Sequence, residues 1–323
     1  SHYRLRAEFK IWHQGCVAHY AMTHPETKKP VFITDFPVAN LAINQLMPPL
    51  LEAINTSDIL RKKCFQVEFL STLNGDTLIT MIYHKPLSEQ WIAAITPVQE
   101  KLNTPIIGRS RKQKLVLQRD YVNATLRILG KDYHYKQIEG GFTQPNGAVC
   151  EQMITWALEN SREFNGDLLE LYCGNANFTL PLAQNFNRVM ATELSKTSVR
   201  AALENVKTNN IDNVALVRMS SEDFVKAMDK VRVFRRLNDI DLDGYQFSSV
   251  FVDPPRAGLD EATVAMIQRF ENIIYISCNP DTLVNNLRTL IQTHDVRALA
   301  AFDQFPYTDH LESGVILSMK KNK

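Results

Sequence analysis

The chain has 323 residues, of which 45% are hydrophobic and 22% are charged, and its formal net charge is +1. This composition is ordinary for a globular protein, and the length is sufficient for two domains. Because no apolar run approaches the about 18 residues of a membrane-spanning helix, the sequence predicts no membrane partner. It also contains no feature that requires an obligate protein partner.

Five cysteines, at positions 16, 64, 150, 173 and 278, form no C-x-x-C pair and no cluster with metal-ligand spacing. An odd number of cysteines without a framework indicates free thiols in the reducing cytoplasm and no bound metal. The sequence begins Ser1-His2-Tyr3 without an initiator Met, so we expect further residues to precede it.

Positive charge gathers in the first half of the chain. Residues 1–140 carry 18 Lys and Arg against 12 Asp and Glu, whereas residues 141–323 carry 18 against 23. A basic module joined to an acidic one indicates that the first half binds a polyanion, although an ordinary solvated surface explains the same excess. We expect one domain over residues 1–140 and a second over residues 141–323.

The first half predicts a small α+β domain. Alternating and β-branched segments indicate strands at 2–12, 65–70, 77–84, 106–107, 114–117 and 133–138, in an antiparallel sheet. Helical patterns cover 36–54, interrupted near Pro48-Pro49, and 86–102. Phe65 and His84 stand at the far ends of the hairpin strands, where they would stack on unpaired RNA bases. A core position for Phe65 and an ordinary surface or core position for His84 are the competing interpretations.

The second half alternates strands with helices, which is typical of a doubly wound parallel sheet. We predict strands at 167–172, 188–193, 214–218, 249–253 and 273–277, and a final pair at 296–302 and 315–318. Helices are predicted over 145–160, 178–185, 195–208 and 281–291, with another beginning near 220. Residues 229–246 are charged and aperiodic, which indicates a surface insertion.

Three features of this half indicate a nucleoside-type cofactor. Gly174 lies in the turn after the first strand, where it lets the backbone approach a ligand. Glu193 ends the second strand, 19 residues later, where an acid accepts hydrogen bonds from ribose hydroxyls. Asp253 ends the fourth strand. Because the turn lacks the G-x-G-x-x-G pattern, a nucleoside without phosphates fits best, and S-adenosylmethionine is the common one; helix capping is the alternative role for such acids.

Cys278 lies where the strand ending at Ser277 meets the helix that begins near Pro280. Ligands of open α/β sheets bind outside the carboxyl ends of the strands. A helix N-terminus would also lower the pKa of the thiol and favour the nucleophilic thiolate. The competing interpretation is a small buried hydrophobic residue.

Five motifs occur in one order along the chain: Phe142-Thr-Gln-Pro-Asn146, Leu169-Glu-Leu-Tyr-Cys-Gly-Asn-Ala-Asn-Phe178, Phe251-Val-Asp-Pro-Pro-Arg-Ala-Gly258, Ile276-Ser-Cys-Asn-Pro280 and His310-Leu-Glu-Ser-Gly314. Together they resemble the RNA uracil-5-methyltransferases over essentially the whole chain. The segments 1–9 and 303–307 resemble the bacterial tRNA (uracil-5-)-methyltransferase group in particular. The clustered cysteines of iron–sulfur members and the N-terminal barrel of many ribosomal-RNA members are missing. Ala176 departs from the family, which usually has Gly there.

The resemblance implies a Rossmann-like, S-adenosylmethionine-dependent methyltransferase domain preceded by a smaller α+β RNA-binding domain. It implies methyl transfer to C5 of the T-loop uridine (position 54) of tRNA, with base flipping and a covalent cysteine adduct, and tmRNA as a further substrate. The implied catalytic residues are Cys278 as nucleophile and Glu312 as proton acceptor. The implied cofactor contacts are Gln144, Tyr172, Asn177, Glu193 and Asp253, and the implied RNA contacts are Phe65, His84 and Arg256.

Several alternatives stay open at this level. Asp309 and His310 compete with Glu312 as the base, a surface salt bridge competes as the role of Arg256, and Glu312 also fits an exposed surface acid. Adenine N6-methyltransferases need an aromatic residue where Arg256 stands, and cytosine-5 enzymes match the Ser-Cys-Asn-Pro context less well. A ribosomal-RNA uracil target is the rival within the family. A mainly tRNA-binding or tRNA-folding protein is the rival outside it.

Overall fold

The computed structural model describes residues 1–321. It forms two compact units, one of residues 1–125 and 137–147 and the other of residues 126–136 and 148–321. A two-stranded hairpin of β8 (Tyr121–Ile128) and β9 (Lys131–Ile138) contributes residues to both units. A single domain boundary at residue 140 stays a prediction.

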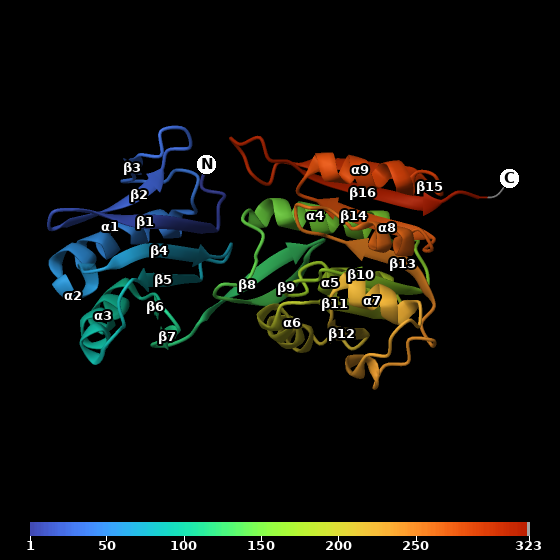
Figure 1. Ribbon diagram of the computed structural model, residues 1–323, viewed down its shortest axis with the longest axis horizontal. Helices are drawn as coiled ribbons and strands as arrows, with labels where there is room; N and C mark the ends of the chain where they lie inside the picture. Colours follow the sequence, from blue (N-terminus) through green and yellow to red (C-terminus); the bar gives the residue numbers. More distant parts are fainter. Residues whose placement is uncertain (322–323) are drawn as a thin grey trace. The chain divides into compact units, whose positions relative to one another are not determined.

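The first unit is built on a seven-stranded sheet in the order β3-β2-β1-β4-β5-β6-β7. Its strands are β1 (Arg6–Gln14), β2 (Val17–Thr23), β3 (Pro30–Phe32), β4 (Cys64–Ser71), β5 (Thr77–Tyr83), β6 (Ile106–Ser110) and β7 (Gln113–Val116) (Figure 1). The fully antiparallel sheet expected from the sequence is wrong at one place, because β5 and β6 are parallel. Helix α3 (Glu89–Leu102) joins these two strands, and a helical crossover allows the parallel direction. Nor does β9 extend this sheet, since it pairs with β8 alone.

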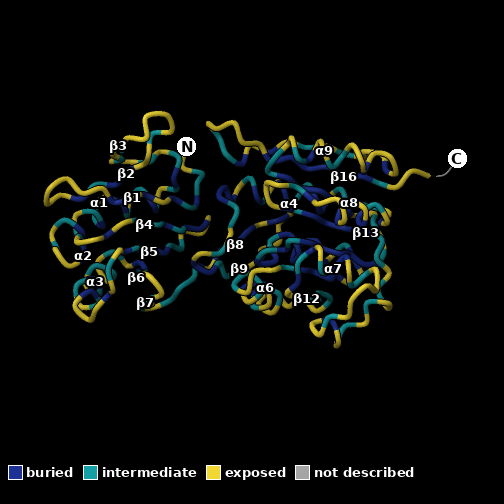
Figure 2. The backbone as a smooth tube through the Cα atoms, in the orientation of Figure 1, coloured by how far each residue is buried: buried dark blue, intermediate teal, exposed yellow. Residues whose placement is uncertain are grey.

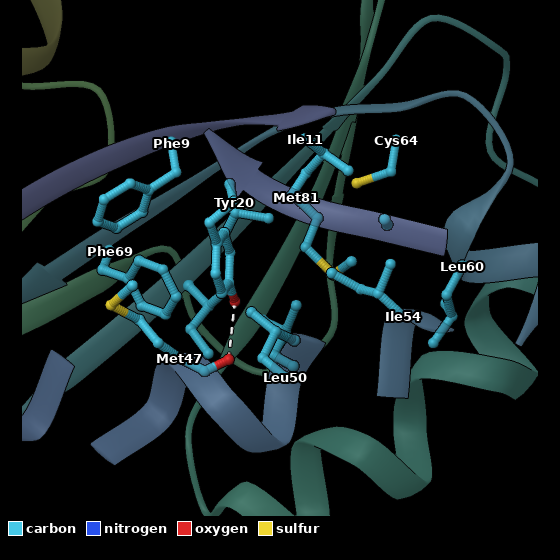
Figure 3. Close-up of a cluster of buried hydrophobic side chains, with 14 of the residues drawn as sticks. Phe9, Ile11, Tyr20, Met47, Leu50, Ile54, Leu60, Cys64, Phe69 and Met81 are labelled. Carbon is cyan, nitrogen blue, oxygen red and sulfur yellow. Dashed lines mark hydrogen bonds between the residues drawn. The ribbon is translucent and has the colours of Figure 1, made fainter. Parts of the chain in front are cut away.

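Helix α1 (Leu41–Thr56), the short α2 (Asp58–Arg61) and α3 pack on one face of this sheet, where aromatic and aliphatic side chains form the core (Figure 3). The predicted interruption at Pro48-Pro49 is wrong, because α1 runs through both prolines. Prolines remove two helical hydrogen bonds, but Met47 and Leu50 on either side are fully buried, and this packing holds the helix. The Tyr20 hydroxyl also donates to the Met47 carbonyl at 3.0 Å.

Two helices of the first unit begin later than the sequence patterns suggest. Helix α1 starts at Leu41 rather than residue 36, because the Asn40 side chain accepts the backbone N–H of Ala42 and caps the helix. Helix α3 starts at Glu89 rather than residue 86, after Ser88 in extended backbone.

The second unit confirms the predicted doubly wound sheet, in the order β12-β11-β10-β13-β14-β16-β15. Its strands are β10 (Asp167–Leu171), β11 (Val189–Glu193), β12 (Val214–Arg218), β13 (Phe247–Val252), β14 (Asn272–Ser277), β15 (His294–Phe302) and β16 (Glu312–Met319). All neighbours are parallel except for β16, which runs antiparallel to both β14 and β15.

Helices cover both faces of this second sheet. Helices α7 (Ser221–Met228), α8 (Glu261–Ile267) and α9 (Pro280–Leu290) pack on the face that carries Leu169, Leu171 and Val250. On the other face, α4 (Gly147–Asn160) brings Trp156 against Gly314. The remaining helices are α5 (Thr179–Leu182), the 3-10 turn η1 (Ala183–Asn185), α6 (Lys196–Thr208) and the 3-10 turn η2 (Arg235–Leu237). Helix α8 was not predicted from the sequence.

The segment between α7 and β13 is mostly exposed, as predicted for residues 229–246 (Figure 2). No helix within residues 1–321 is long and apolar enough to cross a membrane. Because β10, β11, β13 and β14 are parallel, their carboxyl ends meet at one edge of the sheet. The antiparallel β16 begins at this same edge, opposite the end of β14.

Candidate active site

The loop after β10 has an unusual backbone. Tyr172, Gly174 and Ala176 all have positive φ angles, of 61°, 57° and 68°. Only glycine adopts this region without strain, so the two non-glycine residues carry a conformational cost. A Cβ at Gly174 would meet no atom within 4 Å, and the backbone there borders open space. The loop therefore offers its backbone to a ligand at the sheet edge.

Glu193 at the end of β11 holds this loop in place. One carboxylate oxygen accepts the backbone N–H of Gly174 at 3.1 Å, and the other accepts the N–H of Ser195 at 2.6 Å. A carboxylate has about four acceptor positions, so further hydrogen bonds remain available. The geometry suits an acid that also accepts the hydroxyl groups of a ribose.

The two other loop residues implied as cofactor contacts are held by polar partners. The Tyr172 hydroxyl lies 2.6 Å from the Ser221 hydroxyl, and burial raises the pKa of this tyrosine. The Asn177 side-chain amide donates to the Cys150 sulfur at 3.0 Å, and the Asn177 backbone carbonyl accepts the Tyr135 hydroxyl at 3.0 Å. These hydrogen bonds hold the loop at Tyr172 and at Asn177, near its two ends.

Cys278 lies between β14 and α9, as the sequence predicts, and its side chain is half-buried. Asn279 caps α9, since its side-chain oxygen accepts the N–H of Asp281 at 3.1 Å. The Ser277 hydroxyl oxygen accepts the N–H of Asn279 at 3.2 Å. The chain turns sharply at this point, and the thiol is not part of the hydrophobic core.

Glu312 lies opposite Cys278 at the end of the β14–β16 ladder, because Ser277 pairs with Ser313 in antiparallel register. Its side chain is only 3% exposed, and its Oε2 atom has no hydrogen-bond partner among residues 1–321. Burial raises the pKa of Glu312 to about 7, against the opposing effect of Arg256. The interpretation of Glu312 as an exposed surface acid is therefore wrong.

Asp253 follows β13 at the same edge. Burial of its carboxyl group, and then the charge of Glu312, raise the pKa of Asp253 well above its ordinary value. The charge of Glu312 disfavours ionisation of Asp253, so these two carboxyl groups lie near one another here. The sheet edge thus holds fewer negative charges at neutral pH than its acidic residues suggest.

The pKa of Cys278 is raised in this structure, and the lowered value expected from the helix N-terminus is wrong for the chain alone. Burial is the largest cause, followed by the charges of Glu312 and Asp253, while Arg256 acts in the opposite direction. A helix terminus contributes a partial charge, which desolvation and two neighbouring carboxylates outweigh.

Arg256 is exposed, and its backbone is tied to the start of α9. Its carbonyl accepts the Asn279 side-chain amide at 3.0 Å and the Thr282 hydroxyl at 3.3 Å. Its Nη2 atom lies 2.7 Å from the Nδ1 atom of His310. The partner of Arg256 is thus a histidine, and the surface salt bridge considered above is not formed among the described residues. His310 therefore contacts Arg256, and both side chains are exposed.

Three implied site residues belong to the first unit. Phe65 and His84 stack face to face, with ring centroids 4.1 Å apart and an interplanar angle of 21°. Phe65 is 36% exposed, so its interpretation as a core residue is wrong. Gln144 is half-buried in the segment 137–147.

The structure also places polar groups that the sequence analysis missed. Glu170 of β10 is 1% exposed, and burial raises its pKa to about 8. Ser221 and Cys150 hold the loop through the contacts described above. Glu170 could have been found from the sequence, because it is an acid inside the apolar segment Leu168–Leu171. The sequence around Ser221 and Cys150 gives no sign of their contacts with the loop. Residues 1–321 contain no group of three or more His, Cys, Asp or Glu side chains arranged to hold a metal ion.

The doubly wound sheet, with an anchored loop after its first strand and an acid at the end of its second, has the fold of the S-adenosylmethionine-dependent methyltransferases. A crystal structure of a Pyrococcus abyssi tRNA (uracil-54, C5)-methyltransferase with S-adenosyl-L-homocysteine superposes with a TM-score of 0.74. The match covers 98% of this chain and 76% of that one at 20% sequence identity, so it shows the fold.

The chain belongs to the tRNA (uracil-5-)-methyltransferase family, whose sequence model matches residues 1–320. A tRNA/tmRNA (uracil-C(5))-methyltransferase of Saccharophagus degradans is 60% identical over 322 residues, which cover 99% of this chain and 88% of the relative. The protein of the same name from Vibrio parahaemolyticus is 52% identical over 326 residues, which cover 99% and 88%. The resemblance in the sequence motifs is therefore confirmed.

Proposed function

We propose that this enzyme transfers a methyl group from S-adenosylmethionine to C5 of uridine 54 in the T loop of tRNA, with tmRNA as a second substrate. Membership of the family and relatives named tRNA/tmRNA (uracil-C(5))-methyltransferase support the reaction. The observation that carries the proposed mechanism is the position of a half-buried Cys278 and a buried Glu312, which come next to the last pair of the β14–β16 ladder, Ser277 and Ser313. We expect the enzyme to work in the cytoplasm, because its five free thiols suit a reducing compartment.

The residues at the sheet edge fit the methyl donor. S-adenosylmethionine supplies an electrophilic methyl group on a positively charged sulfur. Glu193 would accept the ribose hydroxyls with the acceptor positions that Gly174 and Ser195 leave free. Tyr172, Asn177 and Gln144 would complete the binding site. Asp253, beside Cys278, would lie toward the reacting end.

Cys278 would act as the nucleophile. C5 of uracil reacts poorly with a sulfonium methyl group, and addition of a thiolate to C6 converts the ring to an enolate with carbanion character at C5. Burial disfavours the thiolate of Cys278, but Arg256 favours it. Arg256 would therefore support the ionisation of the nucleophile besides contacting RNA.

Glu312 would act as the general base. After C5 has taken the methyl group, its proton must leave before the Cys278 thiolate can be expelled and the C5–C6 double bond restored. The Oε2 atom of Glu312 has no competing partner in residues 1–321, and a pKa of about 7 suits proton transfer at neutral pH. Asp309 and His310 are the weaker candidates, since both are exposed and His310 contacts Arg256.

The target uracil would be turned out of the T loop into this site, which costs a few kcal/mol for a base in a folded RNA. The stacked pair of Phe65 and His84 would hold unpaired bases of the opened loop. Lys62 and Lys63, which are exposed beside this pair, would neutralise phosphates.

A methyl-transfer assay with unmodified tRNA and labelled S-adenosylmethionine, followed by nucleoside analysis, tests the proposal. We expect label in 5-methyluridine with the wild type and with Cys16→Ala, in which an exposed thiol is lost. Cys278→Ala should give no label while its affinity for tRNA changes by less than about threefold, because binding does not need the thiol. Turnover by Cys278→Ala would exclude the covalent mechanism.

Two other outcomes would change the substrate or the class of protein. Label in ribosomal RNA but not in tRNA would leave the chemistry in place and make the substrate wrong. Binding of tRNA without label in the wild type would favour an RNA-binding or RNA-folding protein.

A further inference from the structure

Exposed aromatic side chains lie on the sheet face of the first unit that the helices leave open. Along β1, Phe9 and Ile11 are buried against the helices, so Trp12 points to the opposite face, because side chains alternate along a strand. Tyr20 of β2 is buried in the same core, which places His19 on the open face with Trp12. Trp12 and His19 are directly paired across β1 and β2.

The aromatic surface continues into β3 at the edge of the sheet. The ring of His19 stacks on that of Phe32, with centroids 4.8 Å apart and an interplanar angle of 24°. Phe32 pairs with Ala21, the residue of β2 that shares a face with His19. Trp12, His19 and Phe32 therefore form a line of rings across three neighbouring strands.

On its other side this line lies beside β4, whose start carries Phe65 of the stacked pair proposed above to hold RNA bases. Regular alternation would place Phe65 on the core face with Val67, but the β4–β5 ladder is irregular between Cys64 and Gln66, and Phe65 stacks on His84, which follows the core residue Tyr83. In the β1–β4 ladder Lys10 pairs with Gln66, the neighbour of Phe65, and the ring of His13 bonds the Cys64 carbonyl at 2.9 Å. The ladder thus brings the end of β1 beside the start of β4. The aromatic row consists of Phe32, His19, Trp12, Phe65 and His84, from strands that are adjacent in the sheet order β3-β2-β1-β4-β5.

The row is accessible although its large rings favour burial. Trp12 is 44% exposed and Phe32 is 41% exposed. The opposite end of the same sheet face is closed, because Leu78, Ile107 and Val122 form a buried cluster there. A group of exposed aromatic rings on one part of a sheet face indicates a binding site.

Lysines lie beside the row and at both of its ends and indicate the kind of partner, while the acids Glu8 and Glu68 lie farther along β1 and β4 on the same face. Lys10 lies beside Trp12, with its Nζ 3.1 Å from the Thr23 hydroxyl. The turn between β2 and β3 exposes Lys28 and Lys29 with one acid, Glu26 (Figure 2). At the other end of the row stand the exposed lysines 62 and 63. Aromatic rings interleaved with cations match a chain of unpaired nucleotides, whose bases stack while the phosphates are neutralised.

We propose that Trp12, His19 and Phe32 form a second base-stacking surface, which binds unpaired nucleotides of the substrate RNA outside the target T arm. This inference rests on the proposed function. From β4 to β3 the row crosses three strand spacings, or about 14 Å, which is the length of about four stacked nucleotides. The surface therefore serves a longer stretch of RNA than the Phe65–His84 pair alone can hold.

The test compares Trp12→Ala with the wild type on two RNAs, a full-length unmodified tRNA and a hairpin with the sequence of its T arm. We expect the variant to bind full-length tRNA about tenfold more weakly, since one base–aromatic stack contributes about 1–3 kcal/mol. Its KM for tRNA should rise by a similar factor while kcat and hairpin binding stay unchanged. Trp12→Phe, which keeps a ring, should restore most of the affinity.

Val116→Ala is the matched control, because Val116 is 43% exposed on β7 of the same sheet, away from the row. Thermal unfolding checks that Trp12→Ala remains folded. Unchanged binding of both RNAs by Trp12→Ala overturns the inference, and so does an equal loss for hairpin and full-length tRNA, which would place the contact within the T arm. A change in self-association without a change in RNA binding would show a protein contact instead. If the wild type neither binds nor methylates tRNA, the proposed function fails, and this inference fails with it.

Discussion

Glu170 offers a quantitative test of the electrostatics beneath the cofactor loop. It lies in the central strand β10, 1% exposed, and neither carboxyl oxygen has a hydrogen-bond partner of normal geometry among residues 1–321. Burial raises its pKa to about 8, and the nearby Thr179 hydroxyl only partly opposes this effect. Glu170 is therefore protonated in the folded protein at neutral pH, while the same residue is ionised in the unfolded chain.

The sign and size of the pH dependence follow from these two states. Unfolding above pH 4.5, the ordinary value for a glutamate, releases a proton from Glu170, so the contribution of this residue to stability falls as the pH rises from 4.5 to about 8. Between pH 4.5 and 7 the loss amounts to about 3 kcal/mol, at 1.36 kcal/mol per pH unit. Glu170→Gln is uncharged in both states and removes this dependence.

Urea unfolding of the wild type and of Glu170→Gln at pH 5, 6, 7 and 8 measures the effect. The difference in the free energy of unfolding should shift in favour of Glu170→Gln by about 3 kcal/mol between pH 5 and 8, the same order as the loss derived above. Glu271→Gln, at an exposed position, is the matched control. A difference that stays constant across this pH range would refute the assignment of a neutral Glu170.

Two further predictions concern the reaction site. Glu312→Gln should lower kcat by about 10²–10⁴-fold and accumulate a covalent RNA–protein adduct on denaturing gels, because the C5 proton has no base; loss of activity without an adduct would exclude Glu312 as the base. Asn279→Ala should lower the stability by about 1 kcal/mol through loss of the α9 cap, measured by thermal unfolding. Asn279→Asp, which can still cap the helix, should lose less, and an equal loss in both variants would contradict a capping role.

The second unit was more predictable from the sequence than the first. Each parallel strand from β10 to β14 is a short apolar segment followed by a turn and a helix start, so local signals and the final topology agree. In the first unit, local signals conflict with tertiary packing. Proline pairs usually end helices, yet burial of Met47 and Leu50 keeps α1 intact. The direction of β6 depends on the crossover through α3, which no local pattern encodes.

The places of the site residues could be predicted where these residues lie at strand ends. Their pKa values could not be predicted from the sequence. Cys278 follows one predicted parallel strand and Asp253 ends another, so their common edge could be anticipated. Glu312 was found only through its motif, because its place beside Cys278 depends on the antiparallel entry of β16 next to β14. The pKa of Cys278 depends on burial and on two carboxyl groups that are distant in sequence, which a local helix-terminus argument leaves out.

Burial favours the proposed proton transfer to Glu312 and disfavours the proposed attack by Cys278. It raises the pKa of Glu312 to about 7, which strengthens this carboxylate as a base at neutral pH. It also raises the pKa of Cys278, which lowers the thiolate fraction. A thiolate of higher pKa is intrinsically more nucleophilic, so part of this loss is offset in reactivity. Arg256 favours the ionised form of both groups, and its side chain is exposed. Under the proposed mechanism, the contact that Arg256 makes with the RNA therefore also sets how readily Cys278 and Glu312 ionise.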